Sequence, residues 1–150
     1  MLTEEKTVPF RAVGYVSQAV QPWNREHLDA LVQRAASFNL EAEVTGVLLF
    51  DGISFLQYLE GPEEGLKRAY ERVLSSPFHS EIIELGRGTV GSRLLPYWSM
   101  HWLLADPSQL RSVARADWTG FVRSNEASRR RATAMDRLHL YLHPYIARPE

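Results

Sequence analysis

Two short apolar runs joined by an Asp-Gly dipeptide constrain the fold of this chain more than any other feature of its sequence. Residues 43–50, EVTGVLLF, and residues 54–60, SFLQYLE, are rich in β-branched and apolar side chains, and Asp51-Gly52 stands between them. Asp-Gly is favoured in tight hairpin turns because their central residues adopt positive φ. The two runs are therefore predicted to be neighbouring antiparallel strands.

Three further segments have the apolar content of strands. Residues 10–17, FRAVGYVS, contain a short apolar run without a helix cap, and residues 81–88 and 97–104 are similar. Each is too short and too rich in β-branched or aromatic side chains to favour a helix. The chain is thus expected to contribute five strands.

Two helices are predicted between these strands. The first follows Asn24, a favourable N-cap residue, and its apolar residues recur at i, i+3, i+4 and i+7. These residues are Leu28, Leu31, Val32 and Ala35. The second helix has Pro62 at its expected first position. Its apolar face comprises Leu66, Tyr70, Val73 and Leu74.

The order of these elements indicates an α+β fold. Strand, helix, strand, strand, helix and strand follow the ferredoxin-like βαββαβ plan, and a fifth strand comes after it. Right-handed crossovers place both helices on the same face of the sheet. The groove between them, floored by the sheet, suits a flat ligand.

The two ends of the chain differ from this central region, residues 10–104. Residues 1–9 are expected to form a flexible arm, and residues 105–150 a helical appendix that begins at Asp106-Pro107. Asn125 is a candidate cap for a second helix there. An apolar stripe follows, made of Ala132, Met135, Leu138, Leu142 and Tyr145. We expect this stripe to cover the free face of the sheet or to contact a partner chain in a homo-oligomer.

Composition excludes several classes of function. The 150 residues include no cysteine, which removes disulfides, thiolate metal sites and cysteine nucleophiles. With 17 basic and 18 acidic residues, nothing attracts the chain globally to nucleic acid or to an anionic membrane. No apolar run approaches the length of a membrane span, and the first residues do not resemble a secretory signal. We expect a cytoplasmic protein without a metal, nucleic-acid or membrane partner.

Two polar residues lie within apolar strands. Tyr15 is in the first strand, and Gln57 shares one face of the third with Phe55 and Leu59. A buried primary amide needs partners for two donors and an acceptor, and a buried phenol also needs a partner. Spacing alone favours ordinary packing or a solvent-facing glutamine. The alternative is that Tyr15 and Gln57 meet and that a polar ligand, also reached by Asn39, completes the set.

Several motifs resemble those of a known family, and this resemblance favours the second alternative, in which Tyr15 and Gln57 meet. The motifs are Tyr15-Val16-Ser17, Asn39, Thr45-Gly46, Gln57-Tyr58-Leu59-Glu60-Gly61 and Trp98-Ser99-Met100. In this order and at these spacings, residues 10–103 resemble a BLUF domain, a blue-light sensor that binds a flavin. The remaining tail resembles the helical cap of short, stand-alone members of that family.

The resemblance implies a site and a mechanism. FAD, with FMN or riboflavin as alternatives, is expected between the two helices. Light is expected to move an electron and a proton from Tyr15 to the flavin and to leave Gln57 rotated or tautomerised. Trp98 and Met100 then pass the change to the fifth strand. The cofactor-binding residues that the resemblance implies are Tyr15, Ser17, Asn39, Gln57, Arg72 and His79.

Three positions depart from residues that are common in the family. Phe38 replaces Asn or His, Ser76 replaces Asp, and Phe78 replaces Arg. These departures motivate an alternative, a flavin-free interaction module. A small hydrolase or nuclease ranks last, because no nucleophile, base and oxyanion donor come together. We therefore expect a receptor and no enzyme, with output through contacts with a downstream signalling protein.

Overall fold

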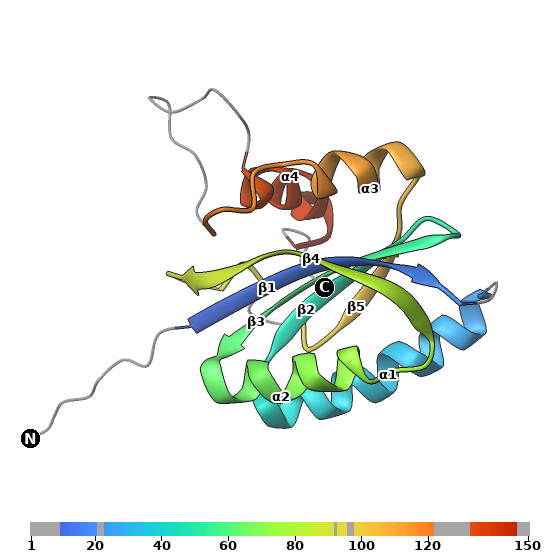
Figure 1. Ribbon diagram of the computed structural model, residues 1–150, viewed down its shortest axis with the longest axis horizontal. Helices are drawn as coiled ribbons and strands as arrows, with labels where there is room; N and C mark the ends of the chain where they lie inside the picture. Colours follow the sequence, from blue (N-terminus) through green and yellow to red (C-terminus); the bar gives the residue numbers. More distant parts are fainter. Residues whose placement is uncertain (1–9, 21–22, 92, 96–97, 122–132, 147–150) are drawn as a thin grey trace, which may run out of the picture.

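A five-stranded mixed sheet forms the centre of the molecule (Figure 1). The computed structural model describes residues 10–20, 23–91, 93–95, 98–121 and 133–146. The strands are β1 (Phe10–Ala19), β2 (Thr45–Phe50), β3 (Ser54–Pro62), β4 (His79–Val90) and β5 (His101–Leu104). Their order is β4-β1-β3-β2-β5, with β5 parallel to β2 and the other pairs antiparallel. The predicted ferredoxin-like plan with an added fifth strand is confirmed.

The predicted hairpin joins β2 to β3. Gly52 has a φ of 102°, a conformation that side chains rarely tolerate. Asp51 Oδ1 accepts hydrogen bonds from the backbone N–H groups of Ile53 and Ser54, at 3.0 and 2.7 Å. The dipeptide thus makes the turn through both of its residues, since glycine supplies the positive φ and aspartate holds the loop.

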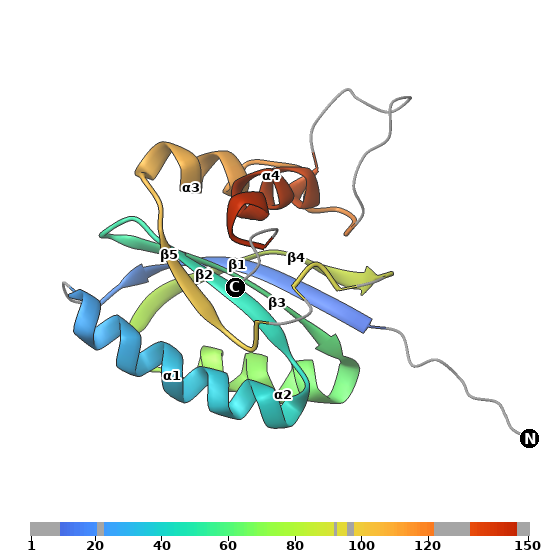
Figure 2. The ribbon, with the colours of Figure 1, turned by 180° about the vertical axis from the view of Figure 1, so that it is seen from behind.

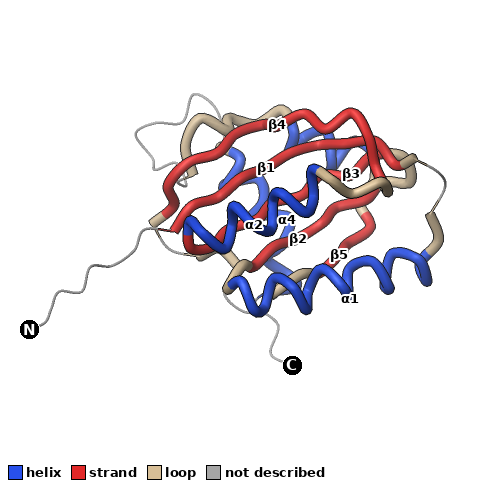
Figure 3. The backbone as a smooth tube through the Cα atoms, turned by 60° about the horizontal axis from the view of Figure 1, so that its bottom comes forward, coloured by secondary structure: helices blue, strands red, loops and turns tan. Residues whose placement is uncertain are grey.

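Helices α1 (Arg25–Ala42) and α2 (Glu63–Leu74) cover one face of the sheet, as Figure 3 shows. The side chain of Asn24 accepts from the N–H of His27 at 2.8 Å and caps α1 as predicted. Pro62 was expected to be the first residue of α2, and this is wrong. Its extended ψ of 150° keeps it paired with Phe10 at the end of β3, so that it is the N-cap and α2 begins at Glu63.

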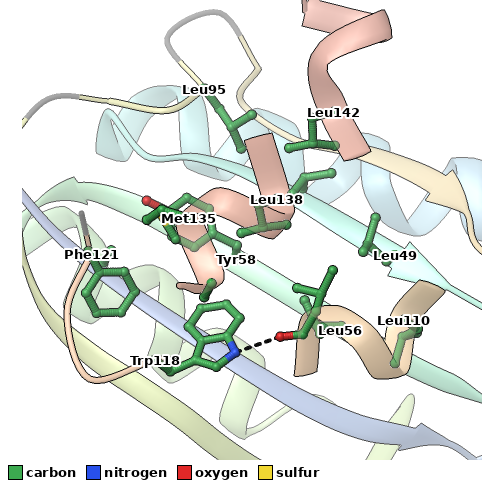
Figure 4. Packing of buried hydrophobic residues seen from close by; sticks show 14 of the residues in the cluster. Leu49, Leu56, Tyr58, Leu95, Leu110, Trp118, Phe121, Met135, Leu138 and Leu142 are labelled. Atoms are coloured by element: carbon green, nitrogen blue, oxygen red, sulfur yellow. Dashed lines mark hydrogen bonds between the residues drawn. The ribbon is translucent and has the colours of Figure 1, made fainter. Parts of the chain in front are cut away.

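Helices α3 (Pro107–Ala114) and α4 (Ala134–Ile146) cover the opposite face of the sheet (Figure 2). Asp106 starts α3 with a reciprocal capping box to Gln109. Met135, Leu138 and Leu142 of α4 pack on β2 and β3 through Leu49, Leu56 and Tyr58, among others (Figure 4). The tail therefore covers the sheet of its own chain, the first of the two arrangements that the sequence left open.

Some details of the tail differ from the prediction or lie outside the description. Tyr145 was expected in the buried stripe, and this is wrong, since it is 46% exposed in the last turn of α4. Its ring lies beside that of Tyr141, with the centroids 6.5 Å apart. Asn125, Ala132 and the arm 1–9 lie outside the described residues. Among the described residues, no helix has the length and apolar character needed to cross a membrane.

The fifth strand is shorter than its apolar run suggested. A strand over residues 97–104 was expected, but β5 begins only at His101. The carbonyl of Ser99 accepts from the Asn39 side chain on α1, at 2.9 Å. This hydrogen bond directs the Ser99 carbonyl toward α1, and Trp98, Ser99 and Met100 lie ahead of the strand.

Candidate functional site

A cavity of about 360 Å³ lies where α1 and α2 meet the sheet. Such a volume falls within the range of small-molecule sites. Its lining comes from β1, β2, β3 and the start of β4, from both helices and the loop after α2, and from Met100 ahead of β5. The predicted site residues on its wall are Tyr15, Asn39, Gln57, Arg72, His79 and Met100, and its apolar lining includes Leu31, Val32, Leu48 and Phe55. Tertiary structure thus brings most of the predicted residues to one place.

Tyr15 and Gln57 are direct neighbours on the floor of this cavity. Residue 15 of β1 pairs with residue 57 of β3 in the ladder, so both side chains leave the sheet on the helix-covered face. Gln57 is 6% exposed and Tyr15 is also buried. The Tyr15 hydroxyl donates a hydrogen bond to Gln57 Oε1. The expectation that these two residues meet is confirmed.

The two amides of the site have hydrogen-bonding capacity left over. Gln57 Nε2 donates to Met100 Sδ at 3.5 Å, which uses one of its two hydrogens. Asn39 Nδ2 donates to the Ser99 carbonyl, and within the described part of the chain Asn39 Oδ1 accepts no hydrogen bond. A cavity with apolar walls, a spare amide donor and a spare amide acceptor suits a flat heteroaromatic ring with complementary polar edges.

His79 and Ser17 form a second hydrogen-bonded pair at one end of the cavity. His79 Nε2 lies 3.0 Å from the carbonyl of Val73, which can only accept, so Nε2 carries a hydrogen. His79 Nδ1 lies 2.6 Å from Ser17 Oγ and accepts from it when the ring is neutral. Ser17 is not part of the cavity lining. Its hydroxyl instead orients His79, which lines the cavity.

The phenol of Tyr15 is held in its neutral form. Burial raises the pKa of Tyr15 well above its ordinary value, and the nearby Tyr70 raises it further. The two rings lie 5.9 Å apart, while the Tyr70 hydroxyl donates away from the cavity, to Glu84, at 3.2 Å. Helical spacing predicts Tyr70 on the buried face of α2, but it cannot predict that this ring lies against Tyr15.

The residues that depart from the family pattern have partners of their own. The Arg72 guanidinium lies 4.4 Å from the centre of the Phe38 ring, in a cation–π contact at the cavity wall. Ser76 Oγ accepts from the N–H of Phe78 at 3.2 Å, and the Phe78 ring lies 5.5 Å from that of Trp23. Phe38 thus gives Arg72 an aromatic partner, and Phe78, which lines the cavity, packs against Trp23.

Met100, and not Trp98, lies beside Gln57. Trp98 packs against the core on the far face of the sheet, and its ring centre is 4.4 Å from that of His101. Met100 packs with the residues under α1 and α2. The resemblance left open which of the two occupies the pocket, and in this structure it is the methionine.

A ferredoxin-like sheet that holds such a cavity under two helices defines a ligand-binding domain of the α+β class. The family model of BLUF domains, described as sensors of blue light using FAD, matches residues 11–101. That match covers more than half of the chain. The protein belongs to the BLUF family of flavin-binding, blue-light-sensing photoreceptors, in which the BLUF domain is the sensor module.

Individual relatives agree with this assignment. The blue light- and temperature-regulated antirepressor BluF of Escherichia coli is 43% identical over 58 residues, which are 39% of this chain and 14% of that protein. A structure titled BlrP1 BLUF is 30% identical and covers 95% of this chain and 93% of its own, with a TM-score of 0.61. Klebsiella pneumoniae BlrP1 with FMN and cyclic diGMP is 38% identical, covering 63% of this chain and 25% of its own (TM-score 0.58).

The curated relatives are much longer proteins. This chain spans between 9% and 14% of the length of those it matches. The similarity therefore concerns the sensor region that these proteins share with it.

Proposed function

We propose that this chain is a light receptor in which Tyr15 and Gln57 read the state of a flavin held between α1 and α2. The observation that carries the proposal is the buried hydrogen bond from the Tyr15 hydroxyl to Gln57 Oε1 at the wall of the cavity. This hydrogen bond joins a phenol that can be oxidised to an amide that can rotate and so exchange its donor and acceptor, at the place where the ligand would lie.

Different residues on the cavity wall are expected to contact different parts of the flavin. Gln57 and Asn39 present an amide donor and an amide acceptor to the ring's polar edge, and Arg72 and His79 lie toward α2 and its end. When bound, a flavin supplies blue-light absorption and an excited state that accepts an electron. We take FAD as the cofactor from the family's description, with FMN as the alternative that the Klebsiella BlrP1 structure contains.

The geometry couples the electron to a proton. Because Tyr15 is buried and neutral, the loss of an electron makes its phenol strongly acidic, and the proton has an acceptor in Gln57 Oε1. Gln57 keeps its net charge if it releases a proton from Nε2 toward the cavity as it takes this one on Oε1, which leaves the tautomer. It also keeps its net charge if the proton and the electron return to Tyr15 and the amide is left rotated. After rotation, Oε1 faces Met100 Sδ, and two acceptors cannot bond each other. The rotation therefore breaks the contact that holds Met100.

We further propose that output passes from Met100 through β5 to other proteins. Met100 directly precedes β5, which is an edge strand of the sheet and is followed by α3. Leu104 of β5 and Leu140 of α4 are exposed apolar side chains, of the kind that contact a downstream protein or a second copy of the chain. In this proposal the chain is a cytoplasmic receptor without enzymatic activity of its own.

The absorption spectrum of the purified protein tests the proposal directly. We expect a yellow protein, or one that becomes yellow with added FAD or FMN, whose flavin bands shift to the red under blue light. Tyr15→Phe should retain the flavin and abolish the shift, because the oxidisable hydroxyl and its hydrogen bond are lost.

Tyr70→Phe is the matched control for this experiment. It removes a hydroxyl from the neighbouring ring, whose hydrogen bond goes to Glu84 and not to Gln57. This variant should keep the red shift. A normal shift in Tyr15→Phe would refute the assigned role.

The second candidate, a flavin-free interaction module, is favoured by the aromatic contacts at Phe38 and Phe78. Under that hypothesis the protein stays colourless in the presence of excess flavin, so the same spectrum separates the two functions.

A further inference from the structure

Glu60 is a fully buried carboxylate on the face of the sheet opposite the cavity. It is 0% exposed, and it belongs to the same strand as Gln57. An odd and an even position of one strand project to opposite faces, so Glu60 points toward the side that α3 and α4 cover. Burying a carboxylate costs several kcal/mol unless its oxygens are hydrogen-bonded. Its partners therefore indicate what the residue does.

Four donors satisfy the two oxygens of Glu60. Oε1 accepts from the Tyr58 hydroxyl at 2.7 Å and from the backbone N–H of Leu94 at 2.9 Å. Oε2 accepts from the Thr45 hydroxyl at 3.0 Å and from the backbone N–H of Leu95 at 2.7 Å. Each oxygen thus takes one hydroxyl and one peptide N–H, which fills the four lone-pair sites of a carboxylate.

The hydrogen bonds from the backbone N–H groups of Leu94 and Leu95 attach to Glu60 a segment of the chain that leads to Met100 and the cavity. Trp98 follows Leu95 by three residues, a reach of at most about 11 Å along the chain. Past that point, the Trp98 carbonyl accepts from the N–H of Gly46 at 2.9 Å, and the Ser99 carbonyl accepts from Asn39. Met100 comes next, against Gln57. Arg93, just before this segment, also donates to the Glu43 carbonyl and to the Thr45 hydroxyl, at 2.8 and 3.1 Å. Glu60 is thus one in a series of attachments, and the last of them is the contact between Gln57 and Met100.

We propose that Glu60 is a positioning residue, whose buried carboxylate fixes Leu94 and Leu95 to β3 and thereby determines where Met100 lies relative to Gln57. This inference rests on the proposed function, because it assigns to Glu60 the regulation of the same site. With the hydrogen bonds from Leu94 and Leu95 to Glu60 (the anchor) in place, Met100 has one defined position in the dark, which it leaves in the light and regains during dark recovery. Loosening the anchor lowers the barrier between the two arrangements, so the light state reverts faster.

Glu60→Gln tests the anchor because it preserves the shape of the side chain while it removes the negative charge and replaces one acceptor oxygen by a donor NH₂ group. In either orientation, the new NH₂ group faces one hydroxyl and one peptide N–H. The hydroxyl can turn and accept, but the N–H of Leu94 or Leu95 cannot, so one anchor is lost. Tyr58→Phe is the matched control, since it also removes one hydrogen bond to Glu60 but leaves both peptide anchors intact.

Two measurements decide the matter in the full chain. Amide hydrogen exchange at Leu94 or Leu95 should accelerate about tenfold in Glu60→Gln and stay close to wild type in Tyr58→Phe, while the amides of β3 remain protected in both. With flavin bound, the dark recovery of Glu60→Gln should be about tenfold faster, with the red shift retained, and that of Tyr58→Phe should change less than about twofold.

The proposal is overturned if both variants accelerate recovery equally, because the effect would then be one of general stability. Unchanged exchange at Leu94 and Leu95 in Glu60→Gln also overturns it. If Glu60→Gln does not fold, exchange in the wild type decides, since both amides must then be as protected as those of β3. Exchange is measurable without flavin, so a colourless protein would refute the proposed function and leave the anchor testable.

Discussion

At the residue scale, β3 carries two buried polar side chains with different tasks. Gln57 faces the cavity and retains spare hydrogen-bonding capacity, while Glu60 faces the other layer with all of its capacity used. A polar group with a spare donor beside a cavity is available to a ligand, whereas a saturated one holds structure. A glutamine within an apolar strand is a recognisable signal, and Gln57 was predicted to be special on that ground. Glu60 carries the same signal as a carboxylate among apolar residues, but no role was predicted for it.

The buried tyrosines predict a loss of stability in alkaline solution. Burial and the neighbouring Glu84 raise the pKa of Tyr70 to about 12, and burial raises that of Tyr15 further. A raised folded-state pKa stabilises the protein fully below the unfolded value of about 10, and this stabilisation is lost as the pH rises toward 12. Denaturant unfolding between pH 8 and 11.5 should show the free energy of unfolding falling above pH 10.

Tyr70→Phe isolates one contribution to this pH dependence. Each such tyrosine contributes a slope of up to about 1.4 kcal/mol per pH unit above pH 10. The variant should therefore show a shallower decline than wild type, with no change of slope between pH 7 and 9. An identical decline in both proteins would contradict the assigned pKa.

At the element scale, the residues at the two ends of α1 determine where the helix begins and ends and what its last turn contacts. Asn24 caps its first turn, and Glu43 ends it in a left-handed conformation with a φ of 63°. The last turn carries Asn39 to the cavity and to the Ser99 carbonyl. The start of α1 could be predicted from the cap residue. Its attachment to the chain ahead of β5 could not, because a contact between residues 60 positions apart leaves no local pattern.

The cap of α1 gives a prediction at this scale. Asn24→Ala should lower the free energy of unfolding by about 1 kcal/mol, because the N–H of His27 loses its acceptor. Asn24→Ser, which retains a capping oxygen, should stay within a few tenths of a kcal/mol of wild type. Urea unfolding followed by circular dichroism measures both, and an alanine variant as stable as the serine variant would show that the cap contributes nothing.

At the scale of the whole molecule, the sheet separates two cores. One lies under α1 and α2 and contains the cavity, and the other lies under α3 and α4. Trp118 closes the second core over Gly14 and Gly86, which face each other in β1 and β4. A Cβ at Gly14 would lie 2.3 Å from the Trp118 ring, so only glycine admits this packing. A tryptophan and two distant glycines give no recognisable sequence motif.

The packing of the tail on its own sheet is testable by truncating one side chain. Leu138 is 0% exposed, and Leu138→Ala should lower the free energy of unfolding by about 2–5 kcal/mol through the cavity it leaves. Leu140→Ala, on the same helix but 75% exposed, should change it by less than about 0.5 kcal/mol. Denaturant unfolding at several protein concentrations provides the comparison. A cost for Leu138→Ala that appears only at high concentration would place this stripe in an interface instead.

The family resemblance of its motifs singled out Tyr15 and Gln57 as a pair. By itself, the local sequence determined the element order, the Asp51-Gly52 turn and the cap at Asn24. These features follow from local backbone preferences and strand alternation, which act over a few residues. Tertiary structure alone decided that α4 covers its own sheet, that Met100 and not Trp98 lies beside Gln57, and that Glu60 holds Leu94 and Leu95. These depend on contacts between segments far apart in the chain, where packing and hydrogen-bond satisfaction select one of several arrangements that the local sequence permits equally.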